Sequence, residues 1–382
     1  MTGLSSILRG GRGAAIGFAL GAVLLFGIAP AVLSDFRLNL LAKLLCFAIV
    51  AVGIGLAWGR GGMLTLGQGV FFGIGAYVMA MHMKIADAEF VDADVPDFMQ
   101  TAGIRELPSY WQPFASPFVA IVAIAVLPAL TALLLGYGVF KRRVKGAYFA
   151  ILSQALAAAL AILLVGQRSI GGSNGLNGFQ TFFGLNLYDP VNKKMLFFVA
   201  AATLLVVLAI TRQVMHSRYG ELLVAVRDQE ERVRFLGYDP ANIKIVAYTI
   251  AAFFAGIAGA LVVPIVGFIT PADIGIAPSI AFLIGVAIGG RTTLLGPVLG
   301  AIGVGWAQSA LSEKFPSGWT YIQGGLFIVV VGFFPAGIAG LAAIRLRRKR
   351  KLDSDDPPPV AASVADPDPD LEPLDLVKEP VR

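Results

Sequence analysis

Few side chains of this 382-residue chain could do chemistry, and they interrupt long apolar stretches. Catalysis within such a stretch needs a nucleophile beside a base, or a set of metal ligands, at one depth. The chain has one cysteine, Cys46, and two histidines, His82 and His216, so the sequence predicts no catalytic site, disulfide framework or metal site. Proton-coupled carriers typically bury an Asp, Glu or His at a helix centre. No long apolar run has an acidic residue in its interior.

The polar groups that remain in the apolar runs are hydroxyls and amides. Four of them lie in or beside glycine-rich stretches and are the candidates for a translocation path: Thr65, Gln68, Gln154 and Asn174. Each is equally suited to hydrogen-bond a neighbouring helix instead. The sequence therefore leaves the residues that contact a solute open.

Glycine clusters interrupt the chain at 59–62, 171–175 and 289–291. Unwound backbone at membrane depth is tolerated only where it is buried in protein or lines a water-filled cavity. These segments are therefore predicted walls of a permeation path. Most other glycines, such as Gly285 and Gly289, have a spacing typical of close packing between transmembrane helices.

The segment 212–244 combines basic residues with an apolar stripe of helical period. The stripe consists of Tyr219, Leu222, Leu223 and Val226, with Val233 and Leu236 predicted on the same side. Gly237, Asp239 and Pro240 are predicted to end this helix. Its other faces carry acidic and basic residues in similar numbers, which favours a groove on a partner protein over a lipid surface.

These residues must be positioned by a membrane-embedded helical fold, because 57% of the chain is hydrophobic and only 14% is charged. Crossing a bilayer takes about 20 apolar residues per helix. The sequence predicts an all-α, polytopic protein with about ten transmembrane helices, or nine if the short run 279–290 is a half-helix or re-entrant segment. The other runs are 14–33, 38–58, 63–83, 117–140, 147–165, 195–211, 245–268, 294–312 and 322–343.

The distribution of charge predicts the orientation of these helices. With both termini in the cytoplasm, most of the Lys and Arg residues fall on the cytoplasmic side, as the positive-inside rule requires. The loop 84–116, rich in Asp and Glu, then lies outside. The net charge of +6 thus indicates membrane topology and not nucleic-acid binding. An alternative for the first run is a cleaved signal peptide.

Two domains are predicted along the chain. Residues 1–345 form the transmembrane domain, with 212–244 as its main cytoplasmic loop. Residues 346–382 begin with a basic membrane anchor and continue as a Pro- and Asp-rich tail whose composition predicts disorder.

Several strings, in the same order along residues 40–341, resemble the branched-chain amino acid (LivM-like) permeases of ABC importers. They are GRGGMLTLGQGVFFGIGAY at 59–77, RRVKGAYFAILSQA at 142–155, GGSNGLNGF at 171–179, SRYGELLVAVRDQEERVRFLGYDPANIK at 217–244, AGIAGAL at 255–261 and GGRTTLLGPVLGA at 289–301. Within that family, the strings at 95–114 and 234–244 are more similar to the urea-transporter permeases. Gln68 replaces a common His of the family, and Ala281 a common Glu, so the resemblance leaves ligand identity open at both positions.

The resemblance implies that 212–244 is the coupling segment that docks on an ATP-binding subunit. Glu231 stands six residues before Gly237, as in the family motif, and Tyr219, Leu222, Leu223 and Arg227 belong to the same helix. The chain has no P-loop, so ATP hydrolysis is expected in partner subunits.

The resemblance further implies a complex in the bacterial cytoplasmic membrane. Its expected partners are a homologous second permease, two ATP-binding subunits, an external solute-binding protein and surrounding lipid, with no cofactor. Urea or a short amide is the expected substrate, because the subgroup strings and an interior without carboxylates both suit a neutral polar solute. Branched-chain amino acids are the alternative, and a stand-alone channel or secondary carrier is the rival class.

Overall fold

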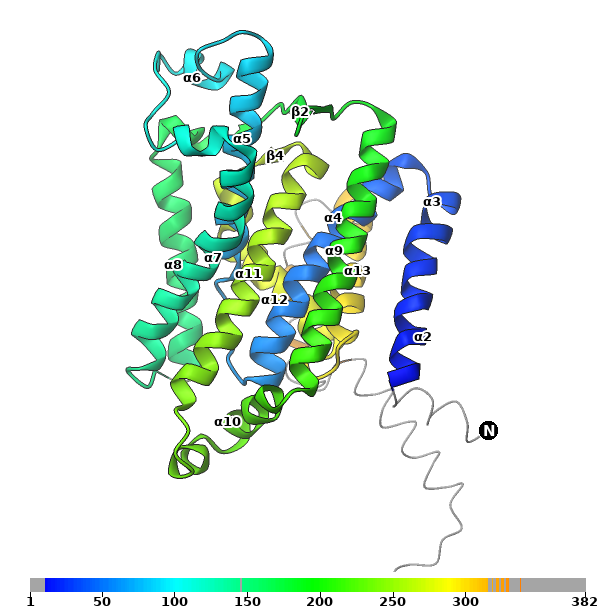
Figure 1. Cartoon of the computed structure of the whole chain (residues 1–382), viewed down its shortest axis with the longest axis vertical. Helices are drawn as coiled ribbons and strands as arrows, with labels where there is room; N and C mark the ends of the chain where they lie inside the picture. The colour runs from blue at the N-terminus through cyan, green and yellow to red at the C-terminus, as the bar shows by residue number, and fades with distance from the viewer. Residues whose placement is uncertain are drawn as a thin grey trace, which may run out of the picture. The chain divides into compact units, whose positions relative to one another are not determined.

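The computed structural model describes residues 11–144 and 146–314, together with 318, 321–322, 324–325, 328–329 and 337 (Figure 1). The predicted anchor and tail at 346–382 lie outside the described residues, as does most of the predicted run 322–343. The α-helices are α2 (Gly11–Ala22), α3 (Ala29–Val32), α4 (Asp35–Ile54), α5 (Gln68–Phe90), α6 (Asp97–Thr101), α7 (Pro117–Phe140), α8 (Ala147–Val165), α9 (Pro190–His216), α10 (Arg218–Phe235), α11 (Pro240–Val266), α12 (Ile276–Gly289) and α13 (Gly296–Lys314).

Short elements join these helices. Two are π-helical, η1 (Val23–Ile28) and η2 (Gly55–Arg60), and four are 3-10 turns, η3 (Gln112–Ala115), η4 (Arg168–Ile170), η5 (Gly172–Asn174) and η6 (Pro271–Ile274). The strands are β1 (Leu176–Asn177), β2 (Thr181–Phe182), β3 (Leu185–Asn186) and β4 (Phe268–Ile269). β1 pairs antiparallel with β4, and β2 with β3.

Six helical segments within the described residues are long and apolar enough to cross a membrane. They are Asp35–Arg60, Gln68–Phe90, Pro117–Phe140, Ala147–Val165, Pro190–His216 and Pro240–Val266. Each coincides with a predicted run, so the helical, membrane-spanning fold class is confirmed. Ile16–Val32 and Ile276–Gly289 are shorter apolar helices. The total of about ten spans stays a prediction.

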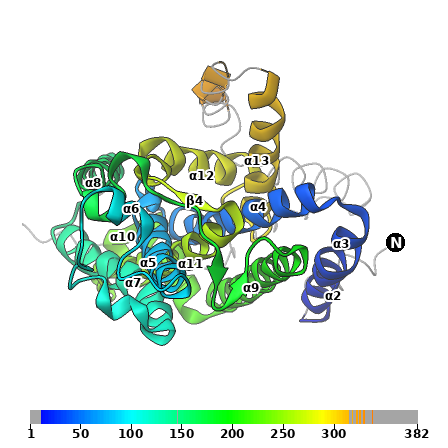
Figure 2. The same cartoon turned by 90° about the horizontal axis from the view of Figure 1, so that it is seen from above.

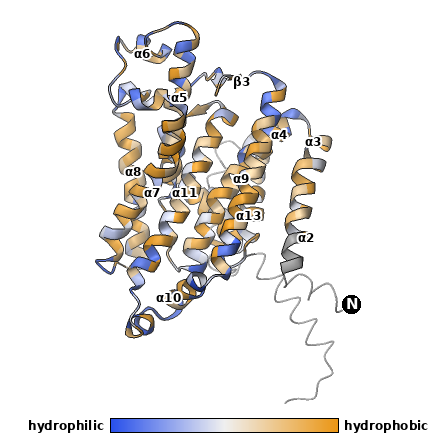
Figure 3. Ribbon diagram, in the orientation of Figure 1, coloured by the Kyte–Doolittle hydropathy of each residue, from blue (hydrophilic) through white to orange (hydrophobic). Residues whose placement is uncertain are grey.

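α11 lies among α4, α5 and α7 (Figure 2), and it packs extensively against all three. Small residues allow these contacts, because the backbones of two membrane helices can approach closely only where side chains are minimal. A Cβ on Gly75 of α5 would collide with the Gly256 backbone of α11. α9 packs on α4, and α13 packs on both α12 and α4. The hydropathy colouring shows apolar residues along all these helices (Figure 3).

The loops that join the helices gather at two ends of the bundle. At one end, which we call the basic end, Arg227 of α10 bonds to the carbonyl of Gly59, Lys141 pairs with Asp239, and the Arg291 guanidinium lies 4.7 Å from the Trp58 ring centroid. These residues come from four loops predicted to share one side of the membrane. An even number of long or short apolar helices separates each of these loops from the next, as the predicted alternation of membrane-spanning helices requires.

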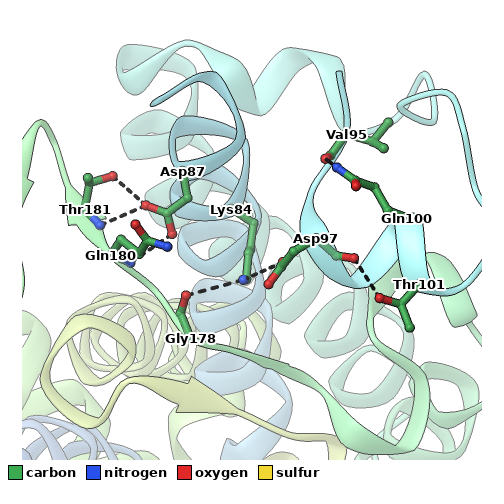
Figure 4. A network of polar contacts seen from close by, with 9 residues as sticks. All are labelled: Lys84, Asp87, Val95, Asp97, Gln100, Thr101, Gly178, Gln180 and Thr181. Carbon is green, nitrogen blue, oxygen red and sulfur yellow. Dashed lines mark hydrogen bonds and ion pairs between the residues drawn. The ribbon is translucent and has the colours of Figure 1, made fainter. Parts of the chain in front are cut away.

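The other end, which we call the acidic end, is held together by buried polar contacts (Figure 4). Lys84, whose side chain is 3% exposed, bonds to Asp97 at 2.8 Å and to the carbonyl of Gly178 at 3.4 Å. The carboxylate of Asp87 accepts three hydrogen bonds, from the amides of Gln180 and Thr181 and from the Thr181 hydroxyl. The last turns of α5 and the loop that follows it are thereby fastened to the segment 178–181.

Two further groups at the acidic end are defined by their surroundings. Burial opposes ionisation of Asp97, but the hydrogen bond and charge of Lys84 outweigh it and hold the pKa of this carboxyl below its usual value. His82 is buried and contacts the carbonyl of Phe114 through Nδ1 at 2.8 Å.

Candidate functional site

The segment 212–244 comprises the end of α9, the whole of α10 and the start of α11. The predicted amphipathic helix, from Tyr219 to Leu236, corresponds to α10, which is kinked. α9 ends at His216, and α10 begins after Ser217, whose side chain accepts a hydrogen bond from the amide of Gly220. Serine is a favoured N-cap because its oxygen satisfies one of the free amides of the first turn. Gln229 then leaves the helical region of backbone space, with φ −148° and ψ 72°, and kinks α10.

The apolar stripe of α10 packs against its own chain. Leu223 and Val226 are buried, and Leu222 is half-buried. The Tyr219 hydroxyl donates a 2.7 Å hydrogen bond to the carbonyl of Ile243, and burial raises the pKa of this phenol. The stripe therefore fixes α10 to the bundle, and only the opposite face and the C-terminal turn remain for a partner.

Arg227 ties α10 to the last turn of η2, just before the unwound segment that leads into α5. Its Nη1 donates a 2.8 Å hydrogen bond to the carbonyl of Gly59, and its Nε donates one of 2.7 Å to Asp228. This hydrogen bond to Arg227 lowers the pKa of the exposed Asp228 carboxyl. α10 is therefore joined directly to η2, which precedes the segment leading into α5.

The C-terminal turn of α10 exposes a cluster of large apolar residues. Phe235 is 90% exposed and Leu236 72% exposed, and the Tyr238 ring is half in solvent. Leu236 was predicted to share the buried side with Val233, and this prediction is wrong because the kink and the end of the helix turn it outward. Gly237 lies between Leu236 and Tyr238. Its φ of +87° suits glycine far better than residues with a Cβ.

Charged side chains surround this exposed cluster. Arg234 bonds to Glu231 at 2.8 Å and to Glu230 at 3.3 Å, and Lys244 bonds to Glu230 at 2.8 Å. Asp239 caps α11 by accepting from the amide of Ala241. A network of charges around an exposed apolar centre is typical of a protein interface.

The four residues predicted for a translocation path do not come together. Thr65 and Gln68 are buried, and the Gln68 amide has no hydrogen-bond partner within the described residues. Gln154 is half-buried on α8, and Asn174 is exposed on η5 at the acidic end. None of the four lines the cavity of about 340 Å³ that is described below.

The chain between η2 and α5 is unwound. The predicted unwound cluster 59–62 coincides with it only in part, since Gly59 and Arg60 belong to η2, and the predicted span 63–83 begins five residues before α5. No helix covers residues 61–67, and the amide of Leu66 donates to the Ser153 hydroxyl at 3.0 Å. Ser153 lies six residues into α8, which is about 9 Å from the start of that helix. The Gly69 amide similarly donates to the Ser279 hydroxyl of α12 at 3.1 Å. Side chains from two other helices thus satisfy backbone donors in and beside this unwound segment.

A cavity of about 340 Å³ lies among α4, α5, α11, η6, α12 and α13. Its lining is mostly apolar and includes Ala281, but it also contains two charged side chains and an amide, namely Lys43, Asp273 and Gln308. Sequence reasoning missed Lys43, although it is the one basic residue of the apolar run 38–58. Asp273 gave no sequence signal, because it lies in a loop between two runs.

Comparison with known families agrees with the helical membrane fold. Residues 36–331 match the family described as "Branched-chain amino acid transport system / permease component". The chain is 28% identical over 355 residues to the high-affinity branched-chain amino acid transport system permease protein LivM of Escherichia coli K12, covering 86% of this chain and 76% of that protein.

Two other relatives have names of the same kind. The permease protein BraD of Pseudomonas aeruginosa is 24% identical over 312 residues, covering 77% of this chain and 91% of that protein. The permease protein LivH of Escherichia coli K12 is 24% identical over 301 residues with the same two coverages. No solved structure matches the chain.

Proposed function

The chain belongs to the family of branched-chain amino acid ABC transporter permeases, and on that premise we propose that it translocates branched-chain amino acids across the bacterial cytoplasmic membrane. It is a permease component and not itself an enzyme. A second homologous permease, two ATP-binding subunits and an external binding protein complete the importer. The relatives named LivM and LivH support the pairing of two permeases.

The single observation that carries the substrate is the collinear similarity to permeases named for branched-chain amino acids. The comparisons give no support to the expected urea or short amide. The physical reason for that expectation also weakens, because Lys43 and Asp273 place both signs of charge in an interior cavity. Two opposite charges in one cavity suit a zwitterion better than a neutral solute.

We place the basic end in the cytoplasm, since the positive-inside rule puts Lys- and Arg-rich short loops there. There the C-terminal turn of α10 docks on an ATP-binding subunit through Phe235, Leu236 and Tyr238, and Glu231 contributes to its charged border. Tyr219, Leu222, Leu223 and Arg227, which also belong to the predicted coupling helix, anchor the segment to the permease. The hydrogen bond from Arg227 to Gly59 supports a mechanical link from this turn to the unwound connection and α5.

The experiment is uptake by proteoliposomes that contain the complete importer. Leucine, isoleucine and valine should accumulate against a gradient only with ATP, both ATP-binding subunits and the binding protein. Accumulation of urea without any of the three amino acids would overturn the substrate. Flux of equal rate by the permease alone would favour the channel or carrier.

A pair of variants tests the coupling assignment within the same assay. Glu231→Ala should lower ATP-driven leucine uptake by about tenfold while the complex still reaches the membrane, since interface residues of this kind contribute about 1–2 kcal/mol. Glu221→Ala is the matched control, because Glu221 is exposed on the first turn of α10, away from the C-terminal turn. Equal uptake by wild type and Glu231→Ala would contradict the role of Glu231.

A further inference from the structure

We propose that the cavity lined by Lys43 and Asp273 binds the transported amino acid as a zwitterion, with Lys43 facing its carboxylate and Asp273 its ammonium group. This inference rests on the proposed function and adds to it a substrate site within the membrane domain. The aliphatic side chain of the ligand packs on the phenylalanines of the same cavity.

The apolar part of the cavity is a cluster of three aromatic rings. Phe282 lies 5.2 Å from Phe47 and 5.5 Å from Phe72 between ring centroids, and Phe47 lies 6.3 Å from Phe72. Contacts of this geometry make a firm surface for an aliphatic group. The volume of about 340 Å³ falls in the range of small-molecule sites, about 300–1,000 Å³.

The charge on Lys43 has no counter-ion among the described residues. Its Nζ lies 5.5 Å from the Phe47 ring centroid. Among the residues that the structure describes, this cation–π contact is the one polar or charged interaction of Lys43. Lys43 is the ninth residue of α4, which places its Cα about 12 Å along a membrane-spanning helix. A lysine at such a depth costs free energy unless it is paired, and residues of this kind mark substrate pathways. A ligand carboxylate supplies the missing partner.

Asp273 has one carboxylate oxygen engaged and one available. Its Oδ2 accepts from the amide of Thr270 at 2.9 Å and from the Thr270 hydroxyl at 2.6 Å, which fixes the orientation of the side chain. Oδ1 accepts no hydrogen bond from the described residues. A carboxylate held rigidly at a cavity wall, with one oxygen unused, is suited to a ligand ammonium group.

The proposal further requires that the charges act on opposite parts of one ligand. Lys43 comes from α4 and Asp273 from η6, so two elements far apart in sequence contribute one charge each to a single cavity. Small residues such as Ala277 and Ala281 on α12 line the same cavity. Removing either charge should therefore weaken binding of the matching ligand group alone.

The test measures protection of an introduced cysteine in the purified complete importer. In a Cys46→Ser background, Ala277→Cys places a reactive thiol on an exposed position of the cavity lining. Leucine should slow its reaction with a water-soluble methanethiosulfonate. Isoamylamine, which lacks the carboxylate, and 4-methylpentanoate, which lacks the ammonium group, should each protect at least about tenfold more weakly, since hydrogen bonds between charged groups are strong. Urea should not protect.

Charge variants then assign each ligand group to its residue. Lys43→Gln should raise the leucine concentration for half-protection about tenfold or more and remove the difference between leucine and isoamylamine. Asp273→Asn keeps an oxygen for Thr270 and should remove the difference between leucine and 4-methylpentanoate. Lys43→Arg should retain protection, which guards against misfolding of Lys43→Gln. Lys194→Gln, at an exposed lysine on α9 that pairs with Asp35, is the matched control and should behave as wild type.

The outcomes separate this inference from the proposed function. If wild-type importer transports leucine but leucine gives no protection, or Lys43→Gln leaves half-protection unchanged, the cavity is not the substrate site and the proposed function stands. If the importer transports no branched-chain amino acid at all, the proposed function itself fails. Protection by urea with none by leucine would overturn both.

Discussion

The two ends of the bundle differ in how their charged and apolar side chains are buried and paired. At the acidic end, buried Lys84 and Asp87 are satisfied within the chain, and short strands join loops far apart in sequence. At the basic end, α10 is kinked and ends in exposed Phe235 and Leu236. Exposed apolar residues such as Phe90 also occur at the acidic end, so the difference lies in their setting. At the basic end they follow a kinked helix whose charged side chains form a network, which suits a partner.

The largest expected effect comes from placing a charge on the exposed cluster. Phe235→Asp should weaken co-purification of the ATP-binding subunit by about 100-fold or more, because a buried aromatic at the centre of an interface contributes about 2–4 kcal/mol. The measurement is the amount of that subunit retained by tagged permease.

Phe90→Asp is the matched control for Phe235→Asp, since Phe90 is similarly exposed but lies at the acidic end. It should leave retention of the ATP-binding subunit unchanged. Equal losses for both variants would erase the contrast between the ends.

The next effect tests whether the acidic end depends on internal contacts. Asp87→Asn removes the charge that accepts three hydrogen bonds and replaces one acceptor oxygen with a donor. It should lower the free energy of unfolding by about 1–3 kcal/mol, because partly buried donors lose a charged acceptor. Thermal unfolding of the purified complex measures this loss.

Asp92→Asn provides the control for Asp87→Asn. Asp92 is exposed in the same loop with φ of +58°, a backbone conformation that asparagine tolerates well. It should unfold as wild type does. A similar loss of stability in both variants would mean that the loop responds to any change of charge.

A smaller effect concerns the backbone beside the exposed cluster. Gly237→Ala forces a Cβ into left-handed backbone conformation and should reduce stability by about 1–2 kcal/mol. No heavy atom lies within 4 Å of the added Cβ, so strain and not crowding is the cause. Gly237→Asn should retain most leucine uptake, because asparagine adopts this conformation more readily. Equal losses of uptake in Gly237→Ala and Gly237→Asn would mean that any side chain at this position obstructs docking of the ATP-binding subunit.

The smallest effect is a pH dependence at the basic end. The hydrogen bond from Lys141 lowers the pKa of Asp239, so this pair stabilises the fold above the unfolded pKa of about 3.9 and is lost as pH falls through the lower folded value. Both side chains are partly exposed, so its contribution is about 1 kcal/mol or less. Asp239→Asn should flatten the stability between about pH 5 and 3.

Asp189→Asn is the control for Asp239→Asn. Both aspartates precede a proline and cap a helix, α9 and α11, but Lys141 pairs with Asp239 alone. Its pH profile should match that of wild type. Identical flattening in both variants would attribute the slope to the caps and not to the ion pair.

Hydropathy alone predicted the six long helices, because each run of apolar residues had to match the bilayer thickness. The cavity could not be predicted, because elements spread between residues 43 and 308 build it and their contacts are encoded by packing. The outward turn of Leu236 was missed for a local reason. Helical periodicity assumes unbroken geometry, and the kink at Gln229 interrupts it.

The close packing of α12 on α13 constrains how the cavity can change its volume. A Cβ on Gly300 would collide with the Gly285 carbonyl, and one on Gly289 with that of Gly296, so the two backbones touch without intervening side chains. Helices in such contact cannot slide or rotate past each other without steric clash. Any change in cavity volume at this wall therefore requires α12 and α13 to move as one unit, and a disulfide that joins them to α4 should hold the cavity at one volume.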